Sequence, residues 1–219
     1  MPRVYLVDER ITNPQIVLSN IPKHEVGILV TSAMSPLDIV STVLDSLSET
    51  EERLIAQRRA AGVEDPVAGL ITGMRILAHG DCYKLLLGDG ITDRNAAQLV
   101  PLSTYMRTGA TGRCELLGCN VAVSVTRIEQ HLGGAAMSER FGTPCPGWNF
   151  GDFRVRDWSG YRLVRAIARS LGVPTTVGLD SQTSAYDWHF LGPTMTVDPY
   201  GDTTFTGMDT PGTYYRLLP

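Results

Sequence analysis

The chain has 219 residues, of which 43% are hydrophobic, and its formal net charge is −4. This length supports one hydrophobic core, so we expect a single domain over 1–219. Lys23 and Lys84 are its only lysines and its arginines are scattered, which argues against the basic stripe of a nucleic-acid-binding protein. No apolar run approaches the roughly 20 residues of a membrane span. We therefore expect a cytoplasmic protein with no nucleic-acid or membrane partner.

Three short apolar runs predict buried strands, because each is bounded by polar residues, Gly or Pro. They cover 3–7, 26–31 and 74–78. After the second run, Ser35 is expected to cap a helix whose first residue is Pro36. Apolar residues recur at helical spacing over 39–47, and the charged continuation 51–61 is expected to face solvent. Residues 62–69 then form a connecting loop.

The third run is followed by 79–81, where we expect the strand to give way to a loop. Residues 85–90 predict a small hairpin, and Thr92 is expected to cap a helix that continues to about residue 107. The next strand, 114–117, is closely followed by Cys119. Two such strand-helix-strand units predict a right-handed, parallel α/β sheet.

The segment 124–158 is rich in Pro, Gly and Trp in its second half, and we interpret it as an inserted loop or lid. Ser159 then caps an amphipathic helix that Gly172 ends. The next strand is 173–179. From Ser181 onwards, Thr, Val and aromatic residues alternate with Gly and Pro, which predicts hairpins at one edge of the sheet.

His79 and Cys119 each follow a predicted strand, and the carboxyl ends of parallel strands are where ligands bind in such sheets. A histidine can activate a thiol as a nucleophile. Gly80 would let a substrate backbone approach closely, and the amide of Cys119 can point at a developing oxyanion. Spacing alone favours a plainer interpretation, in which Cys119 is a small buried hydrophobe and His79 only ends a strand, since lone Cys and His residues do not specify a site.

The local sequences around these two residues are more specific. The segments 76–80 (Ile-Leu-Ala-His-Gly) and 116–122 (Leu-Leu-Gly-Cys-Asn-Val-Ala) resemble the strand ends of caspase-like, or clan CD, cysteine peptidases. That superfamily includes caspases, metacaspases, gingipains and separases. A closer resemblance is to an uncharacterised bacterial domain family found at the amino ends of large repeat-bearing surface proteins. The resemblance covers roughly 75–180, apart from the segment 124–158.

This resemblance implies a caspase-like three-layer α/β sandwich, a mostly parallel sheet with helices on both faces. It also implies a cysteine endopeptidase in which Cys119 is the nucleophile and His79 the general base and then acid. The amides of Gly80 and Cys119 would form the oxyanion hole. Two departures matter: Ala78 replaces the usual serine, and 118–120 lacks the Gln-Ala-Cys-Arg-Gly signature of true caspases, so aspartate specificity is not implied. The substrate would be a protein or peptide, and no cofactor is needed. A regulatory protein partner is compatible with this function, because a free cytosolic peptidase needs restraint.

Four residues near the strand ends are candidates for substrate binding. The carboxylates of Asp81 and Asp180, the latter followed by Ser181, could line a pocket for a basic side chain. Ordinary turn chemistry is the favoured interpretation of each of these residues taken alone. Trp188 is either the wall of a peptide groove or hydrophobic cover for the sheet.

Two other functions remain open from the sequence. The first is a catalytically inactive domain of the same fold that acts as a protein-binding module. The second is a zinc-stabilised domain that uses His79, Cys82, Cys114 and Cys119. Zinc ligands usually show closer paired spacings, and Cys114 and Cys119 would face opposite sides of a regular strand, so we expect no metal site.

Overall fold

The computed structural model describes residues 2–81, 84–109, 112–118, 159–178, 188, 190 and 194–206. The helices and strands of these residues, in chain order, are β1 (Arg3–Asp8), α1 (Pro14–Ser19), β2 (Val26–Val30), α2 (Pro36–Ala60), β3 (Gly73–Leu77), β4 (His79–Asp81), β5 (Lys84–Leu86), β6 (Ile91–Thr92), the 3₁₀ helix η1 (Ala96–Leu102), β7 (Cys114–Leu116), α4 (Ser159–Leu171), β8 (Thr175–Gly178), β9 (Thr194–Val197) and β10 (Thr203–Thr206).

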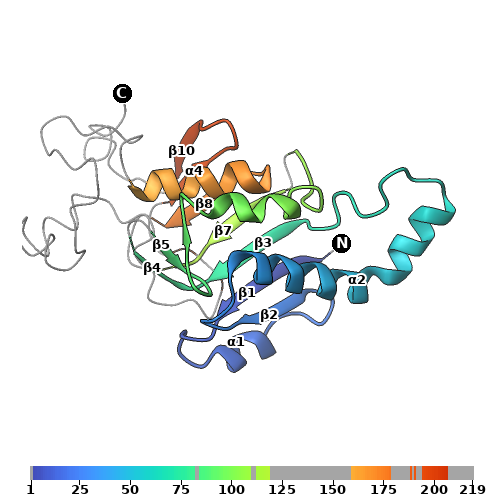
Figure 1. Ribbon diagram of the computed structural model, residues 1–219, viewed down its shortest axis with the longest axis horizontal. Helices are drawn as coiled ribbons and strands as arrows, with labels where there is room; N and C mark the ends of the chain where they lie inside the picture. Colours follow the sequence, from blue (N-terminus) through green and yellow to red (C-terminus); the bar gives the residue numbers. More distant parts are fainter. Residues whose placement is uncertain are drawn as a thin grey trace, which may run out of the picture.

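A seven-stranded sheet forms the centre of the described structure, in the order β10-β9-β8-β7-β3-β1-β2 (Figure 1). The five strands from β8 to β2 are parallel neighbours. β9 runs antiparallel to β8, and β10 runs antiparallel to β9 at the edge. The predicted α/β class with a mostly parallel sheet is confirmed, and the predicted edge hairpin is confirmed for 194–206.

Helices lie on both faces of this sheet. Side chains alternate between the two faces along each strand, so the apolar residues of β1 have to be covered on both sides. Val4 and Leu6 of β1 point into the larger core cluster, which α2, η1 and α4 complete. Tyr5 and Val7 point to the opposite face, where Val17 of α1 packs against them. Figure 1 shows α2 and α4 on one side of the sheet and α1 on the other. The helix α1 was not predicted from the sequence.

The long helix α2 begins where the sequence predicts, at Pro36 after the cap Ser35. The Ser35 hydroxyl accepts a hydrogen bond from the Asp38 amide at 3.2 Å, and the Asp38 carboxylate accepts one from the Ser35 amide at 2.8 Å. This reciprocal capping box satisfies amides that would otherwise lack partners at the helix start. Arg58 and Arg59 in the last turn complement the negative end of the helix dipole.

The predicted helix over 92–107 is wrong. Thr92 belongs to β6, and the helical part is only the 3₁₀ helix η1, which follows Asn95. The Asn95 side chain accepts a hydrogen bond from the Thr92 amide at 2.7 Å, which holds the residues between them in a turn. Pro101 lies inside η1 and has no amide hydrogen, so a regular α-helix could not continue through it.

The predicted loop at 79–81 is also wrong, because these residues form β4. This strand pairs antiparallel with β5, with His79 opposite Leu86. β5 in turn pairs with β6, which confirms the predicted hairpin near 85–90. The three short strands make a second sheet, in the order β4-β5-β6. Three residues are too few to show an alternating pattern, so the strand could not be recognised from the sequence.

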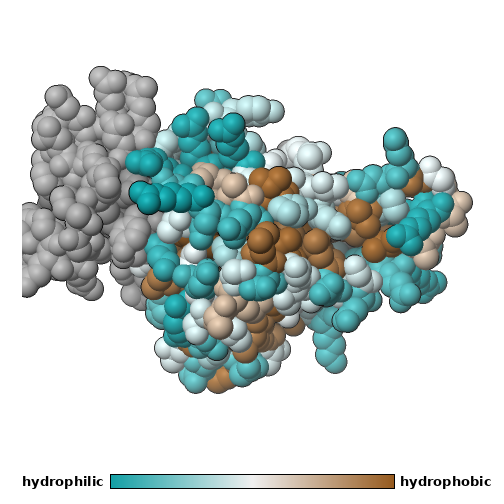
Figure 2. All heavy atoms as spheres, in the orientation of Figure 1, coloured by the Kyte–Doolittle hydropathy of each residue, from teal (hydrophilic) through white to brown (hydrophobic). Residues whose placement is uncertain are grey.

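Both polar and apolar residues reach the face of the molecule that Figure 2 shows. Figure 2 shows apolar residues where α2 and η1 lie next to each other. Leu37 of α2 and Val100 of η1 are about half exposed. None of the described helices combines the length and the apolar character that a membrane crossing requires.

Candidate active site at the carboxyl edge of the sheet

The chain leaves the neighbouring strands β1 and β3 in opposite directions. β1 continues through α1 to β2 at one edge of the sheet, whereas β3 continues through η1 to β7 on the other side. Such a switch point leaves a crevice outside the carboxyl ends of the two strands, and this is where ligands bind in open α/β sheets. Asp8 and Arg10 lie at the end of β1, and His79 follows the end of β3. The topology therefore places His79 where a binding site is expected.

The strands that precede His79 and Cys119 in the sequence, β3 and β7, are paired neighbours in the sheet. Three residues of β3, 74–76, each pair with the residue 40 positions later in β7, as in Ile76 with Leu116. Beyond the last of these pairs, the Leu117 amide donates a hydrogen bond to the Ile76 carbonyl at 2.8 Å. His79 stands three residues after Ile76, and Cys119 three residues after Leu116. Cys119 itself lies outside the described residues, so the structure brings together the two strands that lead to the pair.

One ring nitrogen of His79 has a defined partner. Its Nε2 lies 3.2 Å from the backbone carbonyl oxygen of Arg10. A carbonyl oxygen only accepts, so this contact requires the proton on Nε2. In the neutral ring Nδ1 is then the unprotonated, basic nitrogen. The His79 side chain is otherwise exposed, which leaves it accessible to a substrate.

Asp8 and Arg10 form an ion pair beside this contact, and the sequence pattern did not identify either residue. The Arg10 guanidinium donates from Nε to Asp8 Oδ1 at 2.7 Å and from Nη2 to Oδ2 at 2.8 Å. Asp8 is fully buried, and it also accepts hydrogen bonds from the amides of Arg10 and Gly88. The hydrogen bond that Arg10 donates to the Asp8 carboxylate raises the pKa of the guanidinium above its ordinary value. The available signal was an aspartate directly after an apolar strand.

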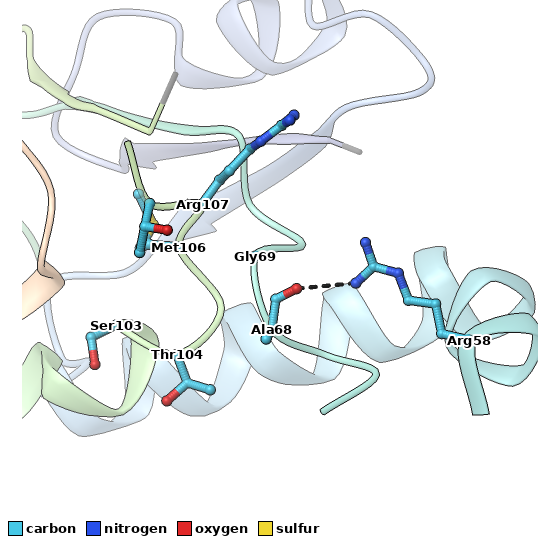
Figure 3. Close-up of a pocket in the computed structure, with 8 residues that line it drawn as sticks. Arg58, Ala68, Gly69, Ser103, Thr104, Met106 and Arg107 are labelled. Carbon is cyan, nitrogen blue, oxygen red and sulfur yellow. Dashed lines mark hydrogen bonds between the residues drawn. The ribbon is translucent and has the colours of Figure 1, made fainter. Parts of the chain in front are cut away.

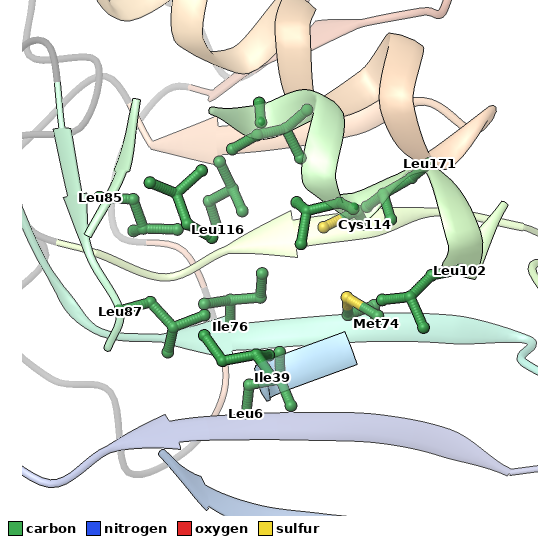
Figure 4. Close-up of a cluster of buried hydrophobic side chains, with 14 of the residues drawn as sticks. Leu6, Ile39, Met74, Ile76, Leu85, Leu87, Leu102, Cys114, Leu116 and Leu171 are labelled. Carbon is green, nitrogen blue, oxygen red and sulfur yellow. The ribbon is translucent and has the colours of Figure 1, made fainter. Parts of the chain in front are cut away.

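The same arginine fixes the turn between β5 and β6. Arg10 Nη2 donates to the carbonyls of Leu86 at 2.8 Å and Gly88 at 2.7 Å. On the other side of the hairpin, Leu85 and Leu87 are fully buried in the main core (Figure 4). The hairpin that carries His79 through β4 is therefore held by polar contacts on one side and by apolar packing on the other.

Only some of the residues predicted for the oxyanion hole and for substrate binding lie among the described residues. Gly80 is half-buried within β4, opposite Leu85. The backbone of Asp81 ends β4 opposite Lys84. Asp180 and Ser181 lie outside the described residues, as do the segment 124–158 and Cys82.

Trp188 packs against the second face of the sheet, just below the carboxyl edge. It is 9% exposed, and its ring meets that of Tyr5 edge to face, with ring centroids 4.7 Å apart. Leu77 and Leu117, at the ends of neighbouring strands, belong to the same buried cluster. The backbone φ of Trp188 is 58°, which lies in the left-handed region that non-glycine residues seldom adopt. This packing fits hydrophobic cover for the sheet.

Cys114 is the one cysteine among the described residues, and its side chain is part of the core. Its side chain is fully buried in the main core near Met74 (Figure 4). Burial raises the pKa of the Cys114 thiol, so it is not a nucleophile at neutral pH. Among the described residues, no group of three or more His, Cys, Asp or Glu side chains is arranged to hold a metal ion.

An open pocket of about 410 Å³ lies at the opposite edge of the sheet (Figure 3). Gly69 and Arg107, which line it, precede β3 and β7 respectively. Arg58 of α2 also lines it and donates a hydrogen bond to the Ala68 carbonyl at 3.0 Å. This pocket contains none of the predicted site residues, because those follow the carboxyl ends of the same strands.

No family model matches the chain, and neither does any curated protein or solved structure. The resemblance of 76–80 and 116–122 to caspase-like peptidases therefore stays a prediction.

Proposed function

We propose that this chain is a caspase-like cysteine peptidase, which hydrolyses peptide bonds of proteins or peptides through Cys119 and His79. The main support for this proposal is the pairing of β3 with β7, because these neighbouring strands directly precede His79 and Cys119 in the sequence. The position of His79 beside the switch point between β1 and β3 also supports it. The hydrogen bond from His79 Nε2 to Arg10 is a third support, since it leaves a basic nitrogen on the ring.

The proposed reaction needs only groups that the chain itself carries. His79 takes the proton of the Cys119 thiol, and the thiolate attacks the carbonyl carbon of the peptide bond. The carbonyl oxygen becomes an oxyanion that the amides of Gly80 and Cys119 stabilise. The carbon–nitrogen bond then breaks, and the leaving amine takes the proton from His79. A water molecule, deprotonated by His79, hydrolyses the thioester and restores the thiol.

The first test is the rate at which iodoacetamide labels each cysteine as a function of pH, followed by mass spectrometry. We expect fast labelling of Cys119 with an apparent pKa below the ordinary value of about 8.5. The substitution His79→Ala should remove this enhancement. Cys114 is the internal control, because its burial should keep it unlabelled until the protein unfolds. Slow labelling of Cys119 that does not depend on His79 would instead support an inactive, protein-binding domain.

The second test is hydrolysis itself, measured with a library of peptides and with Cys119→Ala as the inactive control. Cleavage by the parent that the control lacks would establish the activity. Comparison of peptides with basic and neutral side chains before the cleaved bond, in Asp81→Asn and Asp180→Asn, would show whether either carboxylate selects the substrate.

A further inference from the structure

His79 and Arg10 belong to a closed set of contacts that returns to His79. The His79 side chain donates from Nε2 to the Arg10 carbonyl. The Arg10 side chain donates to the Leu86 carbonyl at 2.8 Å. The Leu86 backbone pairs with the His79 backbone across β4 and β5. The backbone and the ring of His79 are thus both tied to the same arginine, once through its carbonyl and once through its guanidinium.

Asp8 anchors this closed set of contacts to the sheet. It is the last residue of β1, an inner strand that pairs with both β2 and β3. Its buried carboxylate holds the Arg10 guanidinium in a two-point contact, a geometry that a planar guanidinium forms and an ammonium group does not. Asp8 also binds the Gly88 amide, two residues after Leu86. A rigid strand, the arginine and the hairpin are therefore joined by one carboxylate.

We propose that Asp8 and Arg10 are positioning residues, which hold the His79 ring with its proton on Nε2 and its basic Nδ1 free. Neither residue needs to touch a substrate, because both act through the orientation of the imidazole. Loss of the ion pair frees the Arg10 carbonyl and the β5–β6 turn to move, and His79 Nε2 loses its fixed acceptor. The use of Nδ1 as the base for Cys119 rests on the proposed function, whereas the fixed ring does not.

The test is a long-range ¹H–¹⁵N NMR spectrum of the histidine rings in the full chain, which distinguishes the Nδ1–H and Nε2–H forms. The chain has four histidines, and His79→Gln identifies the signals of His79. We expect a single Nε2–H form in the parent. In Asp8→Asn and Arg10→Gln, the signals should shift toward the averaged mixture of a free imidazole.

The matched controls are Asp93→Asn and Arg162→Gln, which remove the more exposed ion pair between Arg162 and Asp93. They change the charges in the same way, and we expect the His79 signals to stay as in the parent. Should Asp8→Asn or Arg10→Gln fail to fold, Arg10→Lys keeps the charge without the two-point geometry and carries the same test. A folded variant of Asp8 or Arg10 whose His79 signals equal those of the parent overturns the proposal.

The labelling rate of Cys119 separates this proposal from the proposed function. If both hold, Arg10→Gln should lower the rate by up to about a hundredfold, as small displacements of catalytic groups do, and Arg162→Gln should not. If Cys119 labels slowly in the parent although the ring of His79 is fixed, the proposed function fails and the positioning role stands.

Discussion

The turn that receives Arg10 can be tested by the substitution Gly88→Ala. Gly88 has a φ of +62°, and a Cβ added there would lie 2.2 Å from the carbonyl oxygen of Met34. That carbonyl is fixed, because it accepts a hydrogen bond from the Asp89 amide at 2.9 Å. The left-handed backbone costs a residue with a Cβ about 1–2 kcal/mol, and overpacking costs about 1–3 kcal/mol more. We therefore expect Gly88→Ala to lower the free energy of unfolding by about 2–5 kcal/mol.

Gly62→Ala is the matched control for this substitution. Gly62 has a similar φ of +72°, but a Cβ there would meet nothing within 4 Å. Its cost should be the backbone term alone, about 1–2 kcal/mol. Urea unfolding of both variants measures the two free energies, and each kcal/mol should lower Tm by about 2–4 °C in a chain of this size. Equal losses in the two variants would refute the steric contact between Gly88 and Met34.

Four further substitutions test the capping of α2 and the core of the sheet. Ser35→Ala should lower the free energy of unfolding by about 1 kcal/mol, and an unchanged urea midpoint would contradict the capping box. The Ser35 hydroxyl and amide lower the pKa of Asp38 below its ordinary value of 3.8. The contribution of the Asp38 carboxylate to stability is therefore present above pH 3.8 and is lost as the pH falls through the lowered pKa. The difference between the parent and Asp38→Asn in urea unfolding should therefore shrink in acid. Ile76→Ala, at a site 1% exposed, should cost about 2–5 kcal/mol, whereas Ile16→Ala, at a site 54% exposed, should cost less than about 0.5 kcal/mol; similar costs would contradict the assigned core.

The elements that could be predicted from the sequence are those whose signals are local. The central strands are short apolar runs between polar residues, and the start of α2 carries its cap and proline within four positions. The helix predicted over 92–107 failed for a local reason too. Apolar residues recur there at helical spacing, but the Asn95 side chain turns the chain at Thr92 and Pro101 interrupts the hydrogen-bond ladder.

The contacts that hold His79 could not be predicted, because they join distant parts of the sequence. Arg10 is 76 positions from Leu86 and 78 from Gly88. Asp8 and Arg10 look like ordinary polar residues after a strand, and only the pairing of β1 with β3 shows that they face the hairpin. The sequence predicted the strand that precedes His79, but the contact of its Nε2, its pairing in β4 and the buried ion pair are properties of the tertiary structure.

The way in which the hairpin is fixed limits how the site can be regulated. A movement of His79 would have to break the contact with the Arg10 carbonyl, and a movement of its strand would disturb the buried Leu85 and Leu87 as well. Each of these costs free energy, and the hairpin leucines alone bury side chains worth about 1.5–3 kcal/mol each. We therefore expect His79 to keep its place whether or not a substrate or a regulatory protein is bound. If the proposed activity is regulated, we expect the regulating change to act on Cys119 and not on His79.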